Sequence, residues 1–79
     1  MDLQLIQGAF RAEDALELLS HMIHIKINYH EAKIASGTSE EDVKYRESRI
    51  KKLQQELADL RTSLRTEDLV NLEGVIKIN

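Results

Sequence analysis

The 79-residue sequence contains no cysteine and no proline, and only three glycines and three aromatic residues. The absence of cysteine excludes disulfide bonds, thiolate metal sites and cysteine nucleophiles. So few aromatic side chains argue against a stacking platform for single-stranded nucleic acid. Apolar residues make up 42% of the chain and charged residues 32%, a balance typical of a folded, helix-rich protein rather than a disordered one.

The sequence also lacks any apolar run near the roughly 18 residues that a membrane span requires. It starts with Asp2 where a secretory signal would have a basic region and an apolar block, so we expect a cytoplasmic protein. A single domain over 1–79 is of a size at which natural proteins add disulfides, a metal or a partner to a small core. Without cysteine and with three histidines, the chain is expected to use a partner.

An amphipathic pattern predicts a first helix over residues 12–35. Its apolar positions form an arc of roughly 200°, much wider than a surface helix needs. One stripe of this arc holds Leu18, Met22, Ile25 and Tyr29, and the other holds Leu16, Leu19, Ile23, Ile27 and Ile34. A single neighbouring helix cannot cover both stripes, so this helix is expected at the centre of an assembly.

A second helix is predicted over residues 39–66. Gly37 is the expected left-handed C-cap of the first helix. Thr38 or Ser39 opens the second helix, and Glu41 stands where it would complete a capping box with Thr38. The heptad, coiled-coil-like seam that follows consists of Val43, Arg46, Ile50, Leu53, Leu57, Leu60 and Leu64.

The connection between the two helices is short, which makes them adjacent and antiparallel. Counting back along both helices from this short turn places Arg46 opposite residues 28–30. Both chain ends, about 2–8 and 70–79, alternate apolar and polar residues, which favours short strands that could pair at the open end of the hairpin. The alternative is a first helix extending back to Asp2 and a frayed C-terminal tail.

The predicted fold is therefore mainly α: an antiparallel two-helix hairpin with short β-strands at both termini. The second stripe of the first helix remains uncovered in such a hairpin. Each large aliphatic side chain in it would contribute about 1.5–3 kcal/mol on burial. We therefore predict a homodimer in which two hairpins form a four-helix bundle.

Four basic side chains interrupt the apolar surfaces near the tip of the hairpin: Lys26, His30, Lys33 and Arg46. Three interpretations are open. In the first, their aliphatic stems pack while the polar ends reach solvent or pair with Glu31, Glu47 or a partner's carboxylate. In the second, they form a polar layer that sets the register of the dimer. In the third, they bind an anion such as phosphate.

Residues 43–52 carry a net charge of +4, from Lys44, Arg46, Arg49, Lys51 and Lys52 against Glu47. A basic zone on a dimer of helical hairpins resembles the architecture of Rop-like RNA-binding proteins. The similarity is one of architecture, and no RNA-contacting residue can be matched to it. If the basic zone binds nucleic acid, the contacts are expected at Lys44, Arg49, Lys51 and Lys52. The overall charge of −3 argues against a strong electrostatic footprint, so nucleic-acid binding is the alternative function.

Glu17, His21 and His24 share the polar face of the first helix and are the candidate metal ligands. No second helix would complete their coordination shell, so we expect a solvated face, no metal and no cofactor. No nucleophile–base arrangement and no glycine-rich phosphate loop indicates catalysis. The sequence thus predicts a self-associating interaction or assembly module that is not an enzyme, with an unidentified protein as a possible further partner.

The residues Gly8-x-Phe10, Ala15 and Lys26-Ile27-x-x-His30 form a pattern that resembles small uncharacterised bacterial helical-hairpin proteins. The resemblance implies terminal strands flanking two helices and a recurring role for Lys26 and His30. It implies no activity.

Overall fold

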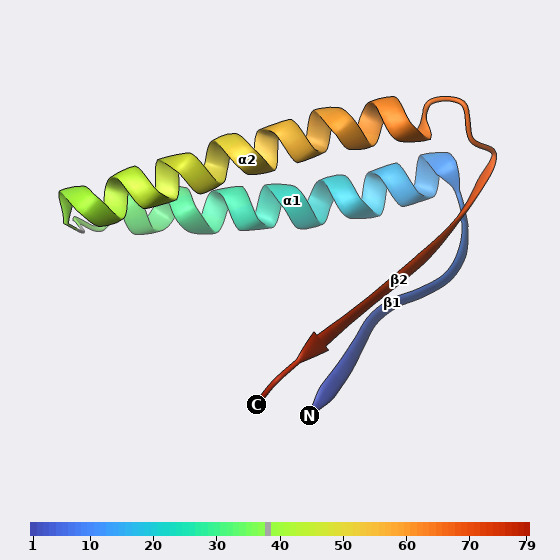
Figure 1. Cartoon of the computed structure of the whole chain (residues 1–79), viewed down its shortest axis with the longest axis horizontal. Helices are drawn as coiled ribbons and strands as arrows, with labels where there is room; N and C mark the ends of the chain where they lie inside the picture. Colours follow the sequence, from blue (N-terminus) through green and yellow to red (C-terminus); the bar gives the residue numbers. More distant parts are fainter. Residues whose placement is uncertain (38) are drawn as a thin grey trace.

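The computed structural model describes every residue except Thr38 and contains two strands and two helices in that described part. Strand β1 (Asp2–Arg11) leads directly into helix α1 (Ala12–Ala35). Helix α2 (Glu40–Leu64) returns antiparallel to α1, and β2 (Leu69–Lys77) pairs with β1 (Figure 1). The predicted helical hairpin with strands at both termini is confirmed, and β1 excludes a first helix that begins at Asp2.

The two helices are joined by a turn in which each helix end is capped locally. Gly37 has a φ of +85°, which is favourable for glycine, and its N–H donates to Ile34 O at 3.3 Å. Ser39 is the N-cap of α2, and its Oγ accepts a hydrogen bond from Asp42 N at 3.2 Å. The predicted capping box involves Thr38, which lies outside the described residues.

The open end of the hairpin is closed by backbone hydrogen bonds rather than by a side-chain cap. Arg11 precedes α1 in an extended conformation and makes no capping hydrogen bond with its side chain. Instead, Ala12 N donates to Asp68 O at 3.0 Å, which satisfies one of the free donors of the first turn. Helix α2 ends at Leu64 and not at residue 66, because Glu67 N donates to Leu64 O at 3.2 Å and this turn leads the chain into β2.

Strands β1 and β2 form a two-stranded antiparallel ribbon, and both extend further toward the helices than the alternating pattern indicated. The pairing runs from Arg11–Leu69 at the base to Asp2–Lys77, with an irregularity between Gln4 and Ile6. The outer end is closed by 2.7 Å hydrogen bonds between the main chains of Met1 and Ile78.

The molecule is flat, with extents of 44 × 32 × 14 Å. Its thickness of 14 Å is little more than the roughly 10–12 Å diameter of one helix, so the elements lie in a single layer. Figure 1 shows the ribbon leaving the base of α1 on the side opposite α2 and diverging from α1. The buried residues of the described chain are Ala12, Ala15, Ile27, Leu53 and Leu57, a small core inside the helical hairpin. In the described residues neither helix is apolar enough over sufficient length to cross a membrane.

Candidate functional site

The most prominent surface feature is an apolar stripe on α1 that α2 leaves uncovered. Helix α2 packs against the side of α1 that contains Ala15 and Ile27, both of which are buried. The other predicted stripe stays open, with Leu18 42%, Ile25 67% and Tyr29 55% exposed. We call Leu18, Met22, Ile25 and Tyr29 the α1 stripe; its spacing of four, three and four residues is that of a helix-packing seam.

The ribbon provides a second apolar surface. Residues paired across an antiparallel ribbon share a face, and alternate pairs lie on opposite faces. One face therefore carries Leu3, Ile6, Phe10, Val70, Leu72 and Ile76, which we call the ribbon face. Its outer members Leu3 and Ile76 are 41% and 43% exposed.

The irregularity in β1 is what places all these residues on one face. Leu3 and Ile6 are an odd number of residues apart, so a regular strand would direct them to opposite faces. The register skips Leu5, and β2 continues without interruption opposite it. An extra residue of this kind is a β-bulge, and here it restores Leu3 to the apolar side.

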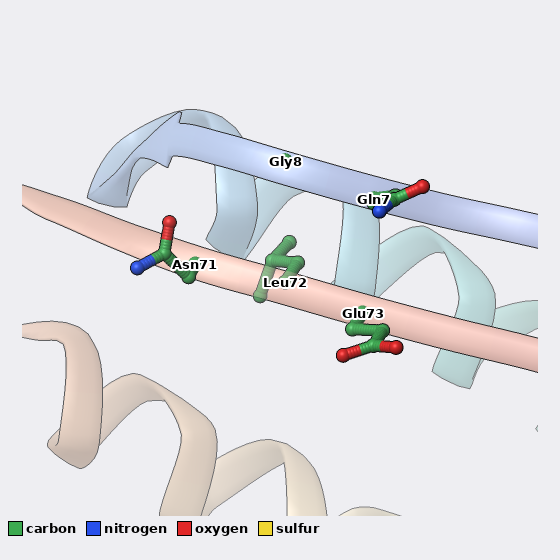
Figure 2. Close-up of a pocket in the computed structure, with 5 residues that line it drawn as sticks. All are labelled: Gln7, Gly8, Asn71, Leu72 and Glu73. Atoms are coloured by element: carbon green, nitrogen blue, oxygen red, sulfur yellow. The ribbon is translucent and has the colours of Figure 1, made fainter.

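Two glycines lie on the ribbon face, each opposite a large side chain. Gly8 faces Leu72 and has a φ of +130°, a conformation that other residues rarely adopt. Figure 2 shows Leu72 across from Gly8, beside a shallow depression of about 320 Å³ that Gln7, Asn71 and Glu73 complete. Gly74 faces Ile6, and a Cβ atom added there would lie 3.2 Å from Ile6 Cγ2.

The α1 stripe and the ribbon face meet at the base of the ribbon. Phe10 from the ribbon face and Leu18 from the α1 stripe line one depression of about 380 Å³, together with Asp14, Glu17 and His21. The two apolar surfaces therefore border the same depression, although its other lining residues are polar.

Arg46 is the best-connected polar side chain at the tip of the hairpin. Its Nε donates to Asp42 Oδ2 at 2.9 Å and its Nη1 donates to His30 Nδ1 at 3.0 Å. Its guanidinium lies 5.7 Å from the centroid of the Tyr29 ring, and its side chain is only 16% exposed. The contact with His30 agrees with the predicted register of the two helices.

These contacts determine the charge of Arg46 and the direction of its hydrogen bond with His30. The hydrogen bond that Arg46 donates to the Asp42 carboxylate raises the pKa of Arg46 further above its ordinary value, so the guanidinium stays charged. Its contribution to stability is therefore present throughout the neutral range and is lost only at very high pH. Because arginine can only donate, His30 Nδ1 is the acceptor of this hydrogen bond.

The four predicted tip residues are brought together only in part. Lys33 Nζ lies 5.7 Å from the Tyr29 ring centroid, on the same aromatic residue as Arg46. Lys26 is exposed and makes no such contact within the described chain. The carboxylate that pairs with Arg46 is Asp42, not Glu31 or Glu47. Since Asp42 and His30 already occupy Arg46, the geometry favours packing and pairing over an anion site.

The candidate metal ligands do not form a site. Glu17, His21 and His24 are all exposed on α1. In residues 1–37 and 39–79, no three His, Cys, Asp or Glu side chains are grouped so that they could hold a metal ion.

The basic zone over 43–52 is divided between two sides of α2. Lys44, Lys51 and Lys52 are exposed, and Lys44 lies 3.9 Å from Glu40. Arg46 is in the seam between the helices, and Arg49 is half-buried. The zone therefore offers nucleic acid fewer free cations than its net charge indicates.

Comparison with known proteins identifies no relative: no family model, no curated protein and no solved structure matches the chain.

Proposed function

We propose that this protein is a self-associating assembly module whose working form is a homodimer. The observation that carries the proposal is the exposed surface of the single chain, 6162 Å². A compact monomer of 9.1 kDa exposes about 4,900 Å². Each chain thus exposes about 1,300 Å² more than its mass requires.

This excess has the size of a stable interface. If two chains covered it against each other, the pair would bury about 2,500 Å², which is within the range of obligate homodimers. The radius of gyration supports the same reading, since it is 15.0 Å against about 11.6 Å for a compact domain of this length.

The small core of the single chain also favours association. Among the residues that the structure describes, five are buried and two of these are alanines, so most large apolar side chains of α1 and the ribbon keep some contact with water. Domains of this size without disulfides or metals rarely gain enough stability from one small core. A twofold pair in which the α1 stripes meet would cover these side chains and bring four helices together, as the sequence predicted.

Nucleic-acid binding in the manner of Rop-like proteins remains the alternative. It receives less support because the basic residues of 43–52 lie on different sides of α2. A titration with RNA at low salt would favour it if binding were tight and weakened steeply with salt.

Substitution in the α1 stripe tests the proposal. Ile25→Glu places a charge at a position that is already 67% exposed in the single chain, so the hairpin itself can accommodate it. We expect light scattering after gel filtration to give twice the chain mass for the unaltered protein and the chain mass for Ile25→Glu. Lys51→Glu, at an exposed site on the outer side of α2, is the control and should keep the dimer. A dimer that survives Ile25→Glu would contradict the use of this stripe.

A further inference from the structure

We infer that the ribbon face is part of the same interface, so that a second copy of the chain covers both the ribbon face and the α1 stripe. This inference rests on the proposed homodimer and extends it from the helices to the terminal strands. In such a dimer the strands are held in place by the partner and do more than join the chain ends.

The ribbon is covered only in part by its own chain. A two-stranded ribbon is marginally stable in water unless one of its faces packs against a helix or a further strand. Here the ribbon diverges from α1 beyond its base (Figure 1), and Leu3 and Ile76 at its outer end remain well exposed. A cover from outside the chain would therefore stabilise the ribbon face.

The amount of excess surface points to a second copy as the cover. The α1 stripe from Leu18 to Tyr29 is about 17 Å long and one helix wide. A contact confined to that strip accounts for only a small part of the roughly 1,300 Å² of excess surface. The ribbon face, about 23 Å from Leu3 to Phe10, supplies the additional apolar surface.

Because the two surfaces border one depression, a single partner can contact both. Phe10 and Leu18 line the same depression where the ribbon meets α1. A copy seated on the α1 stripe on this side therefore also meets the ribbon face. A twofold axis repeats both contacts, so the α1 stripe and the ribbon face of each chain are covered in the same way by the other chain.

The opposite face of the ribbon has a different character. It carries mainly polar residues, namely Asp2, Gln4, Gln7, Arg11, Asn71, Glu73 and Lys77, beside the apolar Ala9, Leu69 and Val75. The ribbon face is therefore the more apolar of the two faces, and neighbouring residues in β2 provide matched test positions on both.

Cysteine cross-linking tests the inference directly, because the chain has no cysteine of its own. Three single variants are used: Ile76→Cys on the ribbon face, Lys77→Cys on the opposite face, and Ile25→Cys in the α1 stripe. Each is oxidised alone, and the two β2 variants are also oxidised after mixing with Ile25→Cys. The products are separated by mass on a non-reducing gel.

We expect Ile76→Cys to form covalent dimers, with itself or with Ile25→Cys, at least tenfold faster than Lys77→Cys. Equal rates for the two β2 variants would overturn the inference. So would cross-linking of Ile25→Cys with itself alone, although the homodimer would then stand. A monomeric mass for the unoxidised protein would instead refute the homodimer itself.

A second measurement follows burial of the ribbon face by the partner without relying on cross-linking. The chain has no tryptophan, so Leu3→Trp is a single fluorescent reporter on the ribbon face. Its emission should shift to shorter wavelength as the protein concentration rises through the dimerisation range. An emission maximum that stays at the solvent-exposed value while the mass doubles would contradict the proposed cover.

Discussion

Arg46 occupies a heptad position of α2 that would ordinarily be apolar, and its surroundings explain how a charged residue is accommodated there. The aliphatic stem packs between the helices while the guanidinium uses separate nitrogens for Asp42 and His30. The Tyr29 ring lies alongside at a distance typical of cation–π contacts. The planar fork of arginine, rather than positive charge alone, is what these partners require.

Replacement of Arg46 by lysine should therefore destabilise the protein even though the charge is kept. We expect Arg46→Lys to lower the melting temperature by a few degrees, since one ammonium group cannot hold both partners in this geometry. Arg61→Lys, at an exposed position near the end of α2, makes the same chemical change without such partners and should leave the melting temperature unchanged. If circular dichroism gave Arg46→Lys the same melting temperature as the unaltered protein, the contacts of Arg46 would contribute nothing to stability.

Gly8 offers a second test at the scale of one residue. Its φ of +130° lies in a region that residues with a Cβ avoid. Gly8→Ala should lower the free energy of unfolding by about 1–3 kcal/mol through backbone strain. Gln7→Ala, at the next position of the same strand, is the control and should have a small effect. Urea denaturation at fixed protein concentration measures the free energy of unfolding of both variants. If Gly8→Ala were as stable as the unaltered protein, the predicted backbone strain at this position would be contradicted.

At the scale of elements, the helices could be predicted closely and the strands only in outline. Each helix carries its apolar pattern over six or more turns, and local signals such as Gly37 and Ser39 mark the turn between them. The strand limits depend instead on pairing between distant parts of the chain. The bond from Ala12 N to Asp68 O, which fixes the base of the ribbon, has no local sequence signal.

The ion pair at the tip of the hairpin and the bulge in β1 differ in the same way: one depends on residues close in sequence, and the other depends on pairing with a distant strand. Asp42 is four residues before Arg46, a spacing that indicates a helical ion pair, so this partner could have been found from the sequence. The bulge at Leu5 could not, because it becomes visible only once the register with β2 is known.

The N-cap of α2 provides a prediction at this scale. Ser39 Oγ satisfies one backbone donor of the first turn, so Ser39→Ala should lower the free energy of unfolding by about 1 kcal/mol. Ser48→Ala, at an exposed site inside α2, removes the same hydroxyl without a capping role and should be neutral or slightly stabilising. The midpoints of urea denaturation of the two variants are compared. If both variants lost the same stability, a specific effect of the Ser39 cap would be excluded.

At the scale of the whole molecule, the central feature is a single flat layer with two exposed apolar surfaces, the α1 stripe and the ribbon face, that border one depression. The helical hairpin buries only one side of α1, and the ribbon diverges from the other side. Such a layer needs a second layer, and a twofold copy of itself provides one with matching surfaces. The function proposed here follows from that shape rather than from any single chemical group.

Sedimentation equilibrium of the unaltered chain at micromolar concentration is the most direct test of this account. We predict a mass of twice the 9.1 kDa of one chain, with cooperative thermal unfolding whose midpoint rises with protein concentration. A cooperatively folded species of one chain mass, with a midpoint independent of concentration, would contradict it.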